Sequence, residues 1–147
     1  MKKIGDYTVR GIGEEADPIK IILFDGKFNT GYRVTSFQVF ASNIDGQYDQ
    51  RCTGKLGTTD DLNQNAVGFW NAGEPREIAW ASSNDGAIDA GGILESVIDP
   101  DNMVIEDLYV YLRSNQNEPV NYIVTMEKYD ITDWQGALGM VRNRAQG

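Results

Sequence analysis

Four carboxylates lie close together in the segment "DPDNMVIED", at Asp99, Asp101, Glu106 and Asp107. Carboxylate oxygens are preferred ligands of calcium, and two carboxylates that face each other across a sugar can hydrolyse a glycosidic bond. The spacing does not match an EF-hand loop, which needs a glycine at its sixth position and a final glutamate. An acidic turn that leads into a strand explains the same residues. Asp99 and Asp101 remain candidates for binding calcium, the one cofactor that the sequence leaves open.

Other catalytic chemistry is restricted by composition. The chain has no histidine and one cysteine, Cys52. It therefore has no histidine-dependent nucleophile, no internal disulfide, and too few ligands for a zinc or copper site. A Walker motif is absent, and "GIGEEA" lacks the pattern of a dinucleotide-binding turn. We expect a protein that is not an enzyme, with no catalytic residues.

Aromatic residues offer a second kind of site. Trp70, Trp80, Tyr109, Tyr111 and Tyr122 could stack on a sugar, but aromatic residues on strands more often pack in a core or on a sheet face. Phe69 and Trp70 stand in the loop-like stretch "AVGFWNAGEP". Because aromatic residues are enriched at protein interfaces, we expect this pair to be exposed and to contact a partner.

Charge and hydropathy limit the kinds of partner that the chain can bind. The chain has 13 basic and 22 acidic residues and a net charge of -9. Such a surface repels nucleic acid, and the longest apolar run, Ile21–Phe24, is far shorter than a membrane span. We expect neither nucleic acid nor a membrane as a partner. Residues 128–147 differ, with three basic residues against two acidic ones.

The residues named above must be positioned by strands. A length of 147 residues fits one domain, 1–147. Alternating apolar residues and turn signals predict six strands. They lie within 18–26, 31–42, 51–56, 76–83, 107–113 and 120–129. Gly-, Asp- and Asn-rich joints separate them, and residues 84–96 read as one such connection.

The pattern also predicts strand faces and neighbours. Phe37, Val39 and Ala41 share a face with Thr35, and Ile78 shares a face with Trp80. Leu108, Val110 and Leu112 share a face, as do Tyr122, Val124 and Met126. Short polar joints predict two hairpins. One joins 20–24 to 32–41, and the other joins 107–113 to 120–129 through "SNQNEP".

The C-terminal stretch 132–147 reads as a short helix and tail. Trp134, Ala137, Leu138 and Val141 form one apolar face, and Arg142 and Arg144 lie at the negative end of the helix dipole. Two glycines make this helix weak on its own, so it must lie on a surface. That surface belongs either to the same domain or to a neighbouring copy. The whole pattern predicts an all-β fold, a jelly-roll-like β-sandwich with one short C-terminal α-helix.

Several segments together resemble a family. They are "MKKIGDYTVRG", "LFDGKFNTGYRVTSF", "REIAWA", "ESVIDPDN", "IEDLYV" and "VNYIVTMEKYDITDWQGALGMVRNRAQ". In these segments, over half of its length, the chain resembles small virion structural proteins of marine tailed phages and related environmental viral genomes. The resemblance implies a non-enzymatic component of the virion and brings no catalytic residues.

Within a virion, we expect a capsid-associated decoration or cement protein, or a small jelly-roll coat subunit. Its partners would be copies of itself, in a homo-oligomer, and other virion proteins. The alternative is a host-recognition or carbohydrate-binding module of a spike or tail fibre. That alternative rests on the aromatic content and the Asp-rich loops.

Overall fold

The fold is an antiparallel β-sandwich, seen in a computed structural model that describes residues 2–15, 18–24, 26, 28–44, 50–62, 70–85 and 93–132. Eight strands lie within these ranges. They are β1 Lys2–Gly13, β2 Ile19–Ile21, β3 Thr30–Ala41, β4 Gln50–Gly57, β5 Glu77–Asp85, β6 Ile93–Ile98, β7 Leu108–Ser114 and β8 Val120–Asp130.

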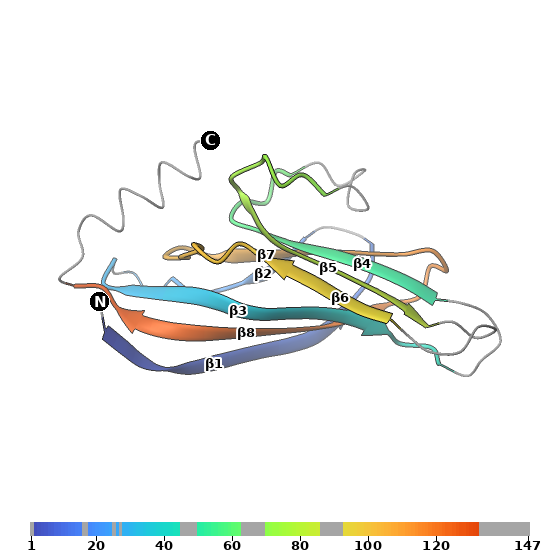
Figure 1. The fold of residues 1–147 in the computed structure, drawn as a ribbon, viewed down its shortest axis with the longest axis horizontal. Coiled ribbons are helices and arrows are strands. Elements are labelled where there is room, and N and C mark those ends of the chain that lie inside the picture. Colours follow the sequence, from blue (N-terminus) through green and yellow to red (C-terminus); the bar gives the residue numbers. More distant parts are fainter. Residues whose placement is uncertain are drawn as a thin grey trace.

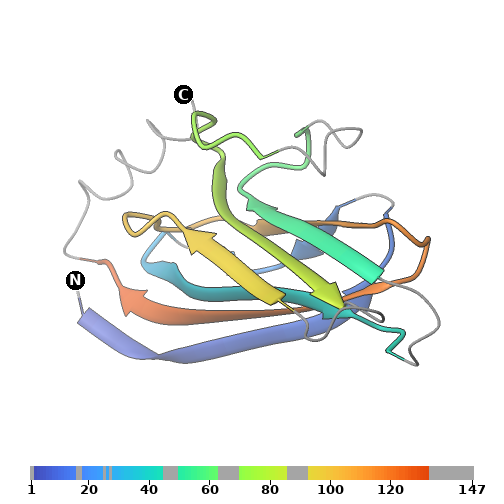
Figure 2. The same ribbon diagram turned by 45° about the vertical axis from the view of Figure 1, so that its right-hand side comes forward.

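The strand order follows a jelly roll in all but one strand. One sheet has the order β1-β8-β3 and the other β2-β7-β4-β5-β6, as Figures 1 and 2 show. In a jelly roll a ribbon of strand pairs 1–8, 2–7, 3–6 and 4–5 wraps into two sheets. Pairs β1–β8, β2–β7 and β4–β5 form ladders here, while β6 pairs with β5 instead of β3. The predicted jelly-roll-like sandwich is confirmed, and the predicted C-terminal helix lies outside the described residues.

The core fills the space between the two sheets. Phe37 and Val39 of β3 are fully buried, as are Val124 and Met126 of β8. A side chain at Gly54 in β4 would come within 2.8 Å of Val39, so its hydrogen lets β3 approach the facing sheet. The predicted apolar faces of β7 and β8 are confirmed, as is the shared face of Phe37, Val39 and Ala41 in β3.

Two β-bulges change the faces that simple alternation predicts. The ladder between β3 and β8 shifts between Val34 and Ser36, so Val34 joins the core and Thr35 is exposed. The ladder between β4 and β5 shifts opposite Ile78. Ile78 therefore belongs to the core, whereas Trp80 packs on the other face of its sheet. Their predicted shared face was wrong for this reason.

Both predicted hairpins were also wrong. β2 pairs with β7 and β3 pairs with β8, so the 20–24 and 32–41 segments lie in different sheets. β7 and β8 likewise belong to different sheets. These joints carry the chain across the sandwich, because in a jelly roll most consecutive strands cross between sheets. β1 and β6 were not predicted from the sequence.

Asn102 occupies the place where β6 would pair with β3. Its Oδ1 accepts the N–H of Val34 at 2.8 Å, and its Nδ2 donates to the carbonyl of Val34 at 3.0 Å. Nδ2 also lies 2.8 Å from the carbonyl oxygen of Asp99. Two residues further along, Val104 and Tyr32 exchange two backbone hydrogen bonds of 2.7 Å. The buried amide side chain thus substitutes for a strand's main chain.

We expect Asn102→Ala to lower the free energy of unfolding by about 2–3 kcal/mol, because Val34 would keep a buried N–H and C=O without partners. Urea denaturation measures the change. Gln38→Ala, at an exposed position of the same strand, is the control and should change it by less than about 0.5 kcal/mol. Equal effects of the two substitutions would refute the role given to Asn102.

Candidate functional site

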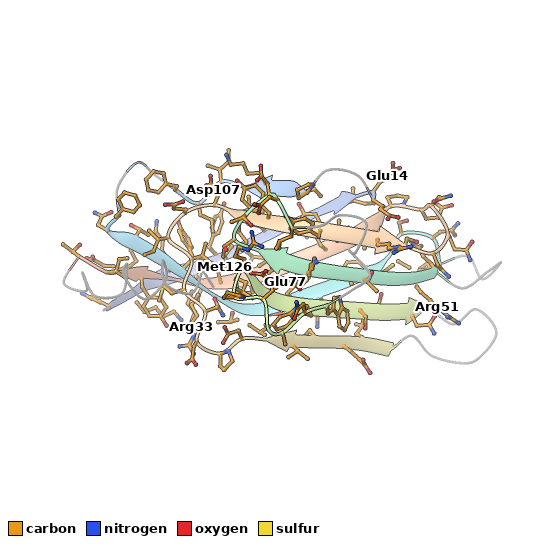
Figure 3. All side chains as sticks on the ribbon, turned by 90° about the horizontal axis from the view of Figure 1, so that it is seen from above. Glu14, Arg33, Arg51, Glu77, Asp107 and Met126 are labelled. Carbon is orange, nitrogen blue, oxygen red and sulfur yellow. The ribbon has the colours of Figure 1, made fainter. Side chains whose placement is uncertain are left out.

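The outer face of the five-stranded sheet has a covered half and an open half. Cross-strand rows in the covered half contain Tyr111, Lys55 and Trp80, followed by Gly57 and Glu77. The described ends of the connection between β4 and β5, residues 58–62 and 70–76, lie over this half, and Leu62 is buried against Tyr111. Figure 3 looks onto this sheet, with Glu77 near its middle and Arg51 toward the open end.

A buried ion pair lies under the connection. The Nζ of Lys55 is 3.3 Å from Oε2 of Glu77, and the side chains are 3% and 5% exposed. The other oxygen of Glu77 accepts the indole N–H of Trp80 at 2.9 Å and the backbone N–H of Asn71 at 3.1 Å. Glu77 thus anchors the end of the connection, and its charge is matched by Lys55.

Tyr111 anchors the start of the same connection. Its hydroxyl donates to the carbonyl of Thr59 at 2.7 Å and accepts the N–H of Leu62 at 3.3 Å. Burial raises the pKa of Tyr111 to about 12, so the phenol keeps its proton at any physiological pH. Lys55 also lies over its ring, 5.6 Å from the centroid.

The open half of this face forms a shallow polar trough, defined by Arg51, Thr53, Ser82, Asn84, Glu95 and Arg113. Thr53 and Ser82 are cross-strand partners, flanked in the same row by Arg113 on β7 and Glu95 on β6. Two hollows of about 350 and 300 Å³ share Arg51 and Thr53. Small side chains in the centre and long ones at the rim make the surface concave.

The trough is locally basic in an acidic protein. None of the ion pairs among the described residues includes Arg51. Arg113 is 3.7 Å from the carboxylate of Glu15, and both side chains are nearly half exposed. Oγ1 of Thr53 and Oδ1 of Asn84 are buried beneath this surface and find no hydrogen-bond partner in the described part of the chain. Buried groups of this kind are usually satisfied by an ordered water or ion.

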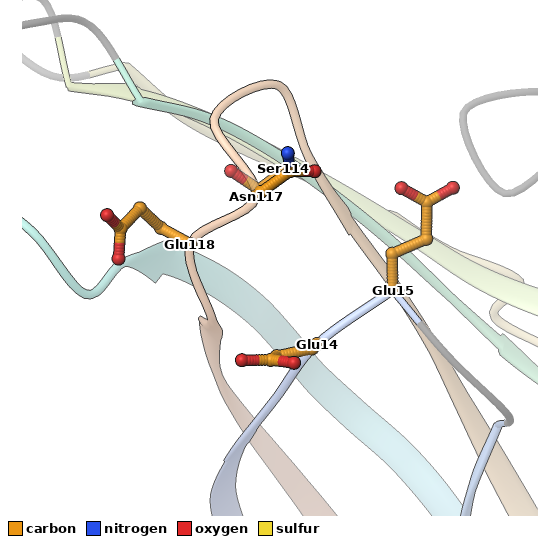
Figure 4. Close-up of a pocket in the computed structure, with 5 residues that line it drawn as sticks. All are labelled: Glu14, Glu15, Ser114, Asn117 and Glu118. Carbon is orange, nitrogen blue, oxygen red and sulfur yellow. The ribbon is translucent and has the colours of Figure 1, made fainter.

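A third hollow lies beside the trough. Glu14, Glu15, Ser114, Asn117 and Glu118 line a pocket of about 280 Å³. Figure 4 shows the carboxylate of Glu15 pointing away from the other two. Within the described ranges, no three His, Cys, Asp or Glu side chains are grouped so that they could hold a metal ion.

The carboxylates of the acidic segment 99–107 make separate structural contacts. Oδ1 of Asp99 accepts the N–H of Asp101 at 3.0 Å, which closes the turn. Asp107 accepts the N–H groups of Leu23 and Phe24 and lies 3.3 Å from Nζ of Lys20. Burial alone would raise the pKa of Asp107, but these donors hold it below its ordinary value. Calcium binding at Asp99 and Asp101 stays a prediction.

The aromatic candidates do not form one platform. Tyr122 lies in the core, and Trp80 and Tyr111 are buried under the β4–β5 connection. Trp70 is 38% exposed, as expected. The other predicted interface residues lie outside the described residues. They are Phe69, Trp134, Leu138, Val141, Arg142 and Arg144.

No protein-family model matches this chain, and no curated protein matches it significantly. The described part of the chain contains no helix long and apolar enough to span a bilayer.

The sequence patterns did not predict the trough, because its residues come from four strands whose pairing is not encoded locally.

We expect Glu77→Ala to lower the free energy of unfolding by about 3–5 kcal/mol, because Lys55 would be left buried without its counter-charge. Urea denaturation measures this loss. The double variant Lys55→Met with Glu77→Gln removes the charge and keeps an acceptor for Trp80, so it should cost less than Glu77→Ala alone. Glu95→Ala, exposed on the same sheet, is the control. A loss no larger than the control's would refute the stabilising role of the pair.

Proposed function

We propose that this chain is a non-enzymatic structural component of a phage virion, a decoration or cement protein or a small coat subunit. It works by assembling with copies of itself and with other virion proteins. The sequence resemblance supports the class of particle proposed. The structure supports the proposal because several buried polar side chains bind the backbone of the domain itself.

Three buried polar side chains in this domain hold its own main chain. Asn102 satisfies the edge of β3 near its start. Gln50, fully buried, accepts the N–H of Asn43 beyond the end of β3 and donates to Ser114 and to the carbonyl of Pro119. Glu77 anchors the β4–β5 connection. A catalytic site keeps such groups directed into a cleft, whereas here they lock loops onto the sandwich, as a building block requires.

The experiment is quantitative mass spectrometry of purified particles from a phage that encodes this chain. We expect a copy number comparable to that of the major capsid subunit. A replication protein of the same phage serves as the control for carry-over from the lysate. Absence of the chain, or an abundance no higher than the control's, would refute the proposal.

A second candidate function is recognition of an acidic saccharide at the trough. Arg51 and Arg113 supply charged donors for a carboxylate, and Ser82 and Asn84 supply a hydroxyl and an amide group for sugar hydroxyls. The observation that favours it is that Arg51, which forms no ion pair among the described residues, lines the same hollow as Ser82 and Asn84. A virion protein with such a trough would contact a host surface polysaccharide.

We expect a galacturonic acid trisaccharide to bind by calorimetry and the neutral galactose trisaccharide to bind at least about tenfold more weakly, because only the acid pairs with arginine. Arg51→Gln should weaken binding of the acid about tenfold. Arg10→Gln, which changes an exposed arginine on the other sheet, should leave it unchanged. Equal affinity for both sugars, or equal effects of both substitutions, would exclude the trough as a site.

A further inference from the structure

Each sheet of the sandwich has two edges, and three of the four are protected. β1 carries charged side chains and a bulge near Lys3, β2 has three residues, and β3 is bridged by Asn102 and Val104 near its start and bulges after Val34. Among the described residues, β6 has none of these protections. It is six residues long, its ladder with β5 is regular, and its one charged residue is Glu95.

The side chains of β6 are exposed on both faces. Leu94 is 56% and Val97 is 62% exposed, and Glu95 and Ser96 between them are exposed as well. Leu94 points to the same side as the core, but the three-stranded sheet does not cover it. An apolar, regular, exposed edge is a template for pairing with another strand.

The main-chain direction at this edge is fixed by one hydrogen bond. The N–H of Asp99 donates to the carbonyl of Ile78 in β5 at 2.9 Å. Alternate residues of an antiparallel strand point their N–H and C=O to the same side. Val97 and Glu95 therefore face β5, while Leu94, Ser96 and Ile98 direct their N–H and C=O groups to the open edge.

We infer that β6 pairs antiparallel with β6 of a second copy, about a two-fold axis at Ser96. In this register Ser96 faces Ser96 of the partner, and Leu94 of each copy faces Ile98 of the other. These three residue pairs each exchange two hydrogen bonds. Glu95 then faces Val97 of the partner. The two neighbouring registers that keep the same hydrogen-bonding pattern are shifted by two residues. One sets Glu95 against Glu95 of the partner, and the other sets Glu95 against Asp99 of the partner. Like-charge repulsion disfavours both shifts.

This contact gives the proposed self-assembly a specific surface, and its first test uses the isolated full chain. Sedimentation equilibrium at 0.15 M salt, which screens the net charge of -9, should show a concentration-dependent dimer. Ser96→Pro removes an N–H directed to the open edge and leaves the β5 ladder intact, so it should weaken the dimer at least about tenfold. A wild-type chain that stays monomeric at every concentration would overturn the inference.

The register is tested by a charge pair that keeps the strand intact. Val97→Lys sets a lysine against Glu95 of the partner, and Val97→Glu sets a glutamate there, so their dimer dissociation constants should differ by about tenfold. Ile12→Lys and Ile12→Glu, at a similarly exposed residue of the other sheet, control for net charge. If the lysine and glutamate variants differ in dissociation constant as much at Ile12 as at Val97, the β6 contact is overturned. Mass spectrometry of particles does not depend on the dimer, so failure of the β6 contact can be told apart from failure of the virion proposal.

Discussion

The free edge of β3 is the constraint on which the rest of this fold depends. A buried strand edge needs hydrogen-bond partners, and in a regular jelly roll the sixth strand supplies them. Here Asn102 and Val104 supply them from the connection that follows β6. Because β3 is satisfied by a side-chain amide and a single bridge, β6 can pair with β5. The sheets then contain three and five strands, and β6 ends at an open edge.

The outer face of the larger sheet shows a second consequence of unequal sheets. Its wide surface is covered on one half by the β4–β5 connection, which Glu77 and Tyr111 tie down through its backbone. The Lys55–Glu77 pair tolerates burial because each charge compensates the other and Glu77 accepts further hydrogen bonds. Arg51 and Thr53, near the start of β4, line the polar trough on the other half of this face.

Sequence patterns predicted strands and their apolar faces but not their partners. Alternation identified the buried side of β7 and β8, because a side-chain period of two is local information. It failed at Val34 and Ile78, where a bulge inserts one residue and no single-residue signal marks it. It also missed β1, whose residues are mostly exposed and do not alternate in hydrophobicity. The "DPDN" turn was recognised, but the role of Asn102 depends on Val34, which is 68 residues away in sequence.

The trough and the β6 edge are linked by geometry. Glu95 belongs to β6 and also lines the hollow that contains Arg51 and Thr53. A two-fold axis between antiparallel strands runs perpendicular to their sheet, so the outer faces of both copies point the same way. Pairing at β6 would therefore set two troughs side by side on one surface. Two weak contacts to a repeating polysaccharide would then act together, since the second becomes an intramolecular event. The proposed assembly at β6 and the proposed recognition at the trough are thus compatible on the same five-stranded sheet.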